Sequence, residues 1–220
     1  MLDVRPDSTS NKFRAARVAR LKTLIDKALQ EKSHCRVLDI GGTYNFWHIW
    51  RDQIDWTRTE VVCVNLDPEH FETGKDETRI SMIKGNACDL HNIKDGEFDV
   101  AFSNSVIEHV GRWSDMKNMA RETRRVAKRY LLQTPYFWFP IEPHARTPFL
   151  HWLPESWAYR IVMARKCGYW TKAKTVSDAV EAVQSAVMLD GRQVAELFPD
   201  ARIERERFLG ITKALMAIRE

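Results

Sequence analysis

The stretch RVLDIGGTYNFW, residues 36–47, joins an apolar run to an aspartate and two adjacent glycines. The run does not alternate with polar residues, so it predicts a strand that is buried on both faces. Glycine tolerates positive φ and lets a ligand approach the backbone, which predicts a tight turn at the carboxyl end of that strand. Ligands of open parallel sheets bind at this edge. Asp39, Gly41 and Gly42 are therefore the first candidate site residues, although either feature alone also fits a plain turn or a helix cap.

Similar apolar runs recur along the chain and alternate with segments of helical spacing. Predicted strands cover residues 35–40, 60–66, 79–85, 98–104 and 129–135. Predicted helices cover residues 11–31, 44–54, 114–129 (with Ser114 as N-cap) and 190–198. This alternation predicts a Rossmann-like, doubly wound α/β sheet. Two last strands, 201–210 and 211–220, leave almost no space for a crossover, so they are expected to pair antiparallel.

Residues 136–189 do not follow the alternation, and their first part is dense in aromatic residues and prolines. We expect an aromatic-rich insertion after the fifth strand, partly loop and partly helical, within a single domain of residues 1–220. The insertion is expected to act as a lid whose tryptophans stack on an acceptor, and it is also a candidate surface for a homodimer. These tryptophans are Trp138, Trp152, Trp157 and Trp170.

Composition narrows the class of protein. Hydrophobic content of 44% and charged content of 29% are typical of a soluble globular chain. The net charge of +4 is spread along the sequence, so no nucleic-acid partner is expected, and the basic stretch 12–22 is interpreted as the solvated face of a helix. No run is apolar enough for a membrane span, and the four cysteines form no CxxC pair. We therefore expect no membrane contact and a reducing, cytoplasmic location.

Four motifs in order resemble those of the class I S-adenosylmethionine-dependent methyltransferases. They are VLDIGG, VVCVNLDPEHFE, IKGNACDL and FDVAFSNSVIEHV, and the terminal hairpin resembles the family's reversed final strand. The segment PYFWFPIEPHARTPFLHWLP further resembles a bacterial, methyltransferase type 11-like subgroup that acts on small molecules, often in sugar modification. The resemblance implies S-adenosylmethionine as cofactor and a seven-stranded sheet with an antiparallel final strand.

The resemblance also implies roles for single residues at the cofactor. Asp39 would orient the methionine end, and Gly41, Gly42 and Thr43 would form the loop beneath it. Ser103 would offer its carbonyl to the methionine ammonium.

Further residues would hold the nucleoside of the cofactor. Asn65 would meet the ribose, Leu66 would pack on the adenine, and Asn86 would read the adenine edge together with Ala87 and Cys88. The sequence departs from the family pattern because both Asn65 and Asn86 replace the usual acids and the loop lacks its later glycines. These departures bear on affinity for the cofactor and not on the fold.

An oxygen nucleophile benefits from a base that removes its proton. His144 is the predicted base, because imidazole titrates near neutral pH and prolines flank its loop. Glu108 and His109 are further catalytic candidates, or they brace a helix. Small-RNA 2′-O-methyltransferases bind a divalent metal through ExxEH and a distant His. Here Ser105 replaces the first Glu, which leaves Glu108, His109 and His144 as possible ligands. Because IEHV also occurs widely in methyltransferases without a metal, we expect none.

The sequence thus predicts a methyltransferase acting on a small-molecule acceptor, with a hydroxyl of a sugar or sugar-nucleotide favoured. Alternatives are an N- or C-methyltransferase of another metabolite, and a degenerate methyltransferase fold that acts as a binding or scaffold protein. An RNA methyltransferase would need a continuous basic surface. A nicotinamide enzyme is disfavoured because GxGxxG is missing.

Overall fold

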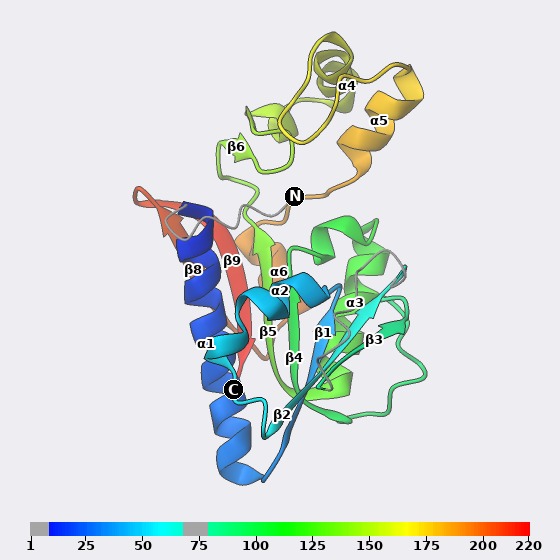
Figure 1. The fold of residues 1–220 in the computed structure, drawn as a ribbon. Helices are drawn as coiled ribbons and strands as arrows, with labels where there is room; N and C mark the ends of the chain where they lie inside the picture. Colours follow the sequence, from blue (N-terminus) through cyan, green and yellow to red (C-terminus); the bar gives the residue numbers. More distant parts are fainter. Residues whose placement is uncertain (1–8, 68–78) are drawn as a thin grey trace.

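The computed structural model describes residues 9–67 and 79–220. Within these residues, one sheet of seven strands has the order β3-β2-β1-β4-β5-β9-β8 (Figure 1). Its strands are β1 (Cys35–Ile40), β2 (Thr59–Asn65), β3 (Ile80–Lys84), β4 (Phe98–Asn104), β5 (Ala127–Pro135), β8 (Arg202–Phe208) and β9 (Ile211–Arg219). The predicted fold is confirmed, including a reversed final strand, because β9 pairs antiparallel with both β5 and β8.

Helices cover both faces of the sheet. The long helix α1 (Thr9–Glu31) and the short helix α2 (Tyr44–Ile49) bury side chains against one face, where Leu21, Trp47 and Phe102 share a core. On the other face, α3 (Trp113–Val126) and α6 (Gly191–Leu197) pack through residues such as Met119 and Leu197. Residues of β1 enter both cores, which is why its sequence is apolar without alternation.

The strand order reverses beside β1, which pairs in parallel with β2 on one side and β4 on the other. Helices that leave these strands go to opposite faces, so a crevice opens at their carboxyl ends. The Gly-Gly turn follows β1 at this point. The fold thus places the sequence-predicted loop at the switch point of the sheet.

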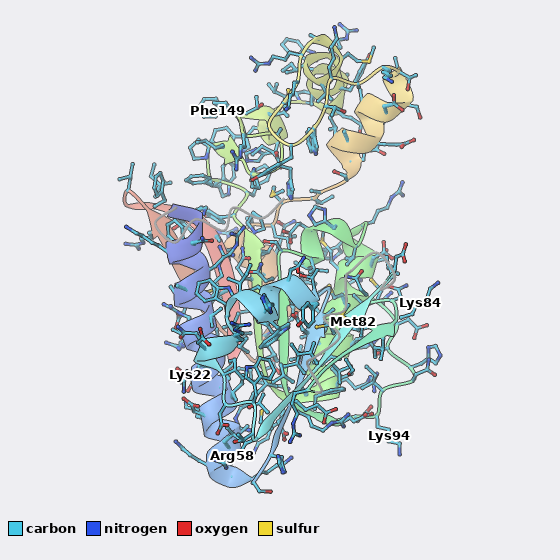
Figure 2. All side chains as sticks on the ribbon, viewed as in Figure 1. Lys22, Arg58, Met82, Lys84, Lys94 and Phe149 are labelled. Carbon is cyan, nitrogen blue, oxygen red and sulfur yellow. The ribbon has the colours of Figure 1, made fainter. Side chains whose placement is uncertain are left out.

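The insertion stands over the carboxyl ends of the strands, where Figure 1 shows it in yellow-green to orange. It contains the paired short strands β6 (Ile141–Glu142) and β7 (Thr147–Pro148), and the helices α4 (Glu155–Ala164) and α5 (Val176–Gln184). Its small core includes Ala145, Leu150 and Cys167. The predicted mixture of loop and helix is confirmed. Figure 2 labels Phe149 in this part of the chain, away from the sheet.

Three short 3-10 helices complete the description: η1 (Arg51–Gln53), η3 (Ile107–His109) and η4 (Leu150–Trp152). The helix predicted for 44–54 therefore ends early, at Ile49, and continues as η1. Among the described residues, no helix combines the length and apolar character that crossing a membrane would require.

Two boundaries around α3 differ from the sequence-based prediction. The predicted N-cap Ser114 was wrong, because it lies inside the first turn and Arg112 is the capping position. Asp115 accepts the Arg112 backbone N–H at 2.8 Å and fixes that start. The helix predicted to reach residue 129 ends at Val126, because Ala127 already pairs with Phe98 of β4.

Candidate active site

The turn after β1 requires both glycines. Gly41 has φ +77°, and a Cβ there would lie 2.4 Å from a methyl of Val106. A Cβ on Gly42 would lie 2.1 Å from Oδ2 of Asp39. The Gly41 N–H donates to the Val64 carbonyl at 2.8 Å, which ties the turn to β2. The loop is therefore closed tightly over the Asp39 carboxylate.

Asp39 is buried at the base of this loop, with 2% of its surface exposed. Its Oδ2 accepts a hydrogen bond from the indole N–H of Trp47 at 2.7 Å. Burial raises the pKa of Asp39 to about 7, and the Trp47 hydrogen bond offsets only part of that effect. A cation at the mouth of the loop would lower this pKa again, so the carboxylate suits an ammonium group.

Ser103 lies beneath the same edge, at the end of β4. It is fully buried, and its hydroxyl donates to the Ile40 carbonyl at 3.1 Å. Its side chain therefore ties β4 to β1. The role predicted for its carbonyl stays a prediction.

The residues predicted to hold the nucleoside lie beyond β2 and β3. Asn65 donates to the Gly42 carbonyl at 3.4 Å and accepts the Leu66 N–H at 2.9 Å, while the Leu66 side chain is 66% exposed. Asn86 accepts the Cys88 N–H at 2.9 Å, so residues 86–88 form a turn that includes Ala87. This turn is distant in sequence from the Gly-Gly loop. Residues 68–72, the end of the VVCVNLDPEHFE motif, lie outside the described residues.

A cavity of about 680 Å³ opens at this edge of the sheet and extends beneath the insertion. One end of it is formed by the Gly-Gly loop and its neighbours: Asp39, Gly41, Gly42, Thr43 and Phe46. Elsewhere its wall comes from α1, the ends of β4 and β5, the β8–β9 hairpin and the insertion: Phe13, Arg14, Arg17, Phe102, Asn104, Ser105, Gln133, Pro135, Tyr136, Phe139, Ile141, Pro143, His144, Arg146, Tyr169, Phe208, Lys213 and Ala214. Six of the residues predicted to contact the cofactor do not line this cavity: Asn65, Leu66, Asn86, Ala87, Cys88 and Ser103.

Three of the predicted catalytic residues gather at the insertion side. One ligand-type atom from each of Glu108, His109 and His144 lies within 4.8 Å of the others, and the two imidazole rings are 4.7 Å apart at 78°. His144 lines the cavity. Glu108 and His109, both on η3, are not among the residues that line it. The structure thus brings together the residues that the sequence separates by about 35 positions.

Hydrogen bonds hold both imidazoles of this cluster. His144 Nδ1 lies 2.7 Å from Glu142 Oε1, and His109 Nδ1 lies 2.7 Å from the Ser185 carbonyl. Burial opposes protonation of His144, but the carboxylate of Glu142 outweighs it and raises the pKa of His144. Burial lowers the pKa of His109. Glu142, two residues before His144, is 3% exposed.

Glu108 is 1% exposed, and burial raises the pKa of its carboxyl to about 7. Its Oε2 accepts the Thr134 hydroxyl at 3.1 Å. Its Oε1 is buried without a hydrogen-bond partner among the described residues. The three groups supply two nitrogens and one oxygen of the types that bind divalent metals.

Residues 38–130 match the family described as methyltransferase domain. The match runs from β1 to β5 and is a likeness to methyltransferase domains over this segment. This confirms the resemblance seen in the ordered motifs. A comparison with curated proteins gave no significant match.

Solved structures have a fold similar to that of this chain. The CurJ carbon methyltransferase is 12% identical, covers 96% of this chain and has a TM-score of 0.57, and this chain spans 55% of its length. A SAM-dependent methyltransferase from Methanosarcina mazei is 12% identical over 85% of this chain and 92% of its own, with a TM-score of 0.50. A Rhodobacter sphaeroides protein described as a Zn-dependent alcohol dehydrogenase is 8% identical. The match covers 89% of this chain and 88% of that protein, with a TM-score of 0.52. At such identities the likeness concerns the fold alone.

The floor of the cavity is held by a residue that sequence reasoning placed on the solvated basic face of a helix. Arg17 of α1 is only 8% exposed. It bonds Glu206 of β8 through two nitrogens at 2.8 and 2.6 Å, and it donates to Asn104 at 2.8 Å and Gln133 at 2.9 Å. The interpretation of the whole 12–22 stretch as solvated was therefore wrong at this position. Nothing local in the sequence indicates a partner 189 residues away.

Two cations line the part of the cavity that the insertion and the β8–β9 hairpin form. The Lys213 ammonium lies 4.1 Å from the Phe13 ring centre, and burial lowers its pKa. The Arg146 guanidinium stacks 4.5 Å from the ring centre of Tyr169 and donates to its hydroxyl. Within residues 9–67 and 79–220, neither cation forms an ion pair with a carboxylate. The electrostatics of this end therefore favour an anionic group.

The rings that line the cavity differ from those predicted. Tyr136, Phe139 and Tyr169 contribute to its wall, whereas the four tryptophans of the insertion do not. Trp138 and Trp152 are 56% and 39% exposed and pack on each other, with ring centres 6.0 Å apart. The prediction that rings near Pro140 face the cavity is confirmed for Phe139. The prediction that the tryptophans stack on an acceptor finds no support in this geometry.

Proposed function

We propose that this chain transfers the methyl group of S-adenosylmethionine to a hydroxyl of a small-molecule acceptor, a sugar or sugar-nucleotide. One observation carries the proposal: the Gly-Gly loop over Asp39 and the His144 wall belong to the same cavity of about 680 Å³. That volume is within the usual range of small-ligand pockets, about 300–1,000 Å³.

The cofactor end fits the methionine part of S-adenosylmethionine. The space above Gly41 and Gly42 is available because neither has a side chain, and the buried Asp39 carboxylate suits the ammonium. In this proposal Thr43 and the Ser103 carbonyl complete that end. Asn65 meets the ribose diol, Leu66 packs on the adenine, and Asn86, Ala87 and Cys88 meet its edge. The exposed Leu66 side chain supports its assignment, because a free apolar side chain beside the loop can cover an aromatic base.

The acceptor end supports a phosphorylated or otherwise anionic substrate. Lys213 and Arg146 supply positive charge, and Tyr136 and Phe139 supply apolar faces on which a sugar or base can pack. The acceptor hydroxyl then lies at His144, between the two ends. Nitrogen and carbon acceptors are less favoured, because this wall is rich in groups that bind charged oxygen.

S-adenosylmethionine supplies an activated methyl group on a sulfonium, and the transfer is an in-line displacement. The protein's contribution is to align the acceptor oxygen and exclude water, which can lower the barrier by about 7–11 kcal/mol. Glu142 fixes the His144 ring by holding Nδ1, so that Nε2 is the nitrogen left to act on the acceptor. His144 promotes loss of the hydroxyl proton.

Calorimetry with S-adenosylmethionine and with its demethylated product tests the cofactor assignment. We expect saturable binding of both with one site per chain. Binding of neither at high micromolar concentration would rule the proposal out. Binding without turnover on any of a panel of sugars, sugar phosphates and sugar-nucleotides would instead support the scaffold alternative.

A further inference from the structure

The cluster of Glu108, His109 and His144 has a feature beyond the proximity of its members. In each imidazole, Nδ1 is already engaged, by the Ser185 carbonyl in His109 and by Glu142 in His144. A carbonyl oxygen can only accept, so His109 must carry its proton on Nδ1 when neutral. The carboxylate of Glu142 favours the same tautomer in His144. Both rings therefore keep a lone pair on Nε2.

Glu108 contributes the third ligand-type atom. Its Oε1 is buried and has no partner in the described part of the chain, while Oε2 is held by Thr134. Leaving a buried polar atom unsatisfied costs about 1–3 kcal/mol, and more for a charged group. Such a cost persists where the atom has a functional partner. The position of Oε1 beside two imidazoles indicates a cation as that partner.

We propose that Glu108, His109 and His144 bind one divalent first-row transition-metal ion, through Oε1 of the glutamate and Nε2 of each histidine. Two nitrogens and one oxygen favour ions such as Mn²⁺, Co²⁺ or Zn²⁺ over Mg²⁺ and Ca²⁺, which prefer oxygen ligands. The sequence alone offered these three ligands only as the less favoured alternative, because Ser105 stands where a further glutamate would have completed the motif.

The surroundings match those of metal-bound histidines. Such histidines usually donate their second ring N–H to a carboxylate or a carbonyl, which fixes the ring and its tautomer. Glu142 and the Ser185 carbonyl occupy these two positions. Glu142 is itself fixed, because its other oxygen accepts the backbone N–H of Ala145. Glu142 is therefore a positioning residue for the ion.

Three protein ligands leave coordination positions open, which distinguishes catalytic from structural metal sites. Because His144 lines the cavity, the ion would lie where a further ligand can reach it from the cavity. The binding of the ion does not depend on the proposed function, but its role does. In that role, the bound ion lowers the pKa of the acceptor hydroxyl. The hydroxyl proton leaves to solvent, the oxygen forms a bond to the methyl carbon, and the carbon–sulfur bond pair stays on sulfur. His144 then acts on the proton through the ion, and not as a free base.

The test uses the full chain, stripped with a chelator and titrated with CoCl2 or MnCl2. Calorimetry should show one ion per chain, and Co²⁺ should develop visible d–d absorption. The variants Glu108→Gln and His109→Gln should abolish both signals. Glu142→Gln should weaken binding about 10–100-fold. His91→Gln, at an exposed histidine outside the cluster, should leave binding unchanged.

Binding of S-adenosylmethionine by each variant shows that it is folded and separates the two proposals. If the stripped chain binds S-adenosylmethionine but neither Co²⁺ nor Mn²⁺, the metal inference fails and the proposed function stands. If the stripped chain binds the ion but not S-adenosylmethionine, the proposed function fails and the metal inference stands. Co²⁺ binding that survives in both Glu108→Gln and His109→Gln would place the ion elsewhere and overturn the inference.

Discussion

At the scale of single residues, Asp39 shows how burial prepares a group for a ligand. The carboxyl is enclosed by the Gly-Gly loop and held by Trp47, and burial raises its pKa to about 7. An isolated buried charge is costly, and an incoming ammonium would remove that cost. The residue therefore links stability of the free protein to cofactor affinity.

This link predicts a pH-dependent stability. The unfolded-state pKa of aspartate is about 3.9. Between that value and about 7 the native protein binds more protons than the unfolded chain, so the free energy of unfolding falls as pH rises. Asp39→Asn should flatten this dependence and make the free protein more stable at pH 8, by an amount on the order of a few kcal/mol. Urea unfolding at pH 5 and pH 8 measures the effect.

The control for Asp39→Asn is Asp52→Asn, because the Asp52 side chain is 95% exposed. It should leave the pH dependence as in the wild type. Parallel stability curves for the wild type and Asp39→Asn would contradict the assignment.

Gly42 predicts a second effect at a single position. In Gly42→Ala the new Cβ meets the Asp39 carboxylate, so either the loop or the carboxylate must move. We expect about a 100-fold loss of affinity for S-adenosylmethionine, a size typical of displaced binding groups. Gly191→Ala is the matched control, because no atom lies within 4 Å of the added Cβ. Equal affinities of the two variants in calorimetry would be incompatible with a cofactor seated on this loop.

At the scale of elements, Arg17 joins α1 to β8 through a buried ion pair with Glu206. Removing one partner leaves the other charge buried, which typically costs about 3–5 kcal/mol. Arg17→Met should therefore destabilise the protein by about that amount. Arg20→Met breaks the more exposed pair with Glu204 and should cost about 1 kcal/mol or less.

Urea unfolding measures both changes. The double variant Arg17→Met, Glu206→Gln should recover part of the loss, since no unpaired charge remains. Similar effects of Arg17→Met and Arg20→Met would show that Arg17 does not hold the cavity floor.

Strands were predictable from sequence to within one or two residues, because β1 and β4 are buried on both faces and their apolar runs end where burial ends. The ends of helices were less predictable from the sequence. Residues 127–129 suit a helix locally, yet pairing with β4 takes them into β5. The local sequence shows the preference of these residues for a helix, but it does not show their pairing with a distant strand.

The candidate site also contains residues that the local sequence reveals and residues that only the fold brings together. The Gly-Gly loop and Asp39 form a local motif and were recognised. The contributions of Arg17 and Lys213 depend on which distant segments meet at the sheet edge. His144 was selected for its chemistry, but its contact with Glu108 and His109 arises from the fold of the insertion.

At the scale of the whole molecule, two separate segments supply the cations of the proposed acceptor end. The insertion supplies Arg146 and the β8–β9 hairpin supplies Lys213. Neither segment belongs to the residues 38–130 that match the methyltransferase domain. In the proposed function, acceptor choice is therefore separable from cofactor binding, whose predicted residues all lie within 38–130.

A variant of Lys213 can test whether acceptor binding is separable from cofactor binding. If it meets a phosphate, wild-type protein should bind UDP more tightly than uridine. Lys213→Met should weaken UDP binding about 10–100-fold, the size of a lost charge-assisted hydrogen bond, and leave uridine and S-adenosylmethionine binding unchanged. Calorimetry measures all three. Lys27→Met, at an exposed ion pair with Glu220, is the control. Equal losses for UDP and uridine would remove Lys213 from phosphate recognition.

The place of β9 between β5 and β8 has a consequence for biosynthesis. On the ribosome, β5 emerges long before residues 211–219, so one edge of the nascent sheet stays open while the insertion is translated. An open edge can recruit foreign strands and nucleate aggregation. Closure also needs contacts of long sequence separation, which slow folding. Nascent chains of this protein should therefore depend on chaperones until the last strand docks.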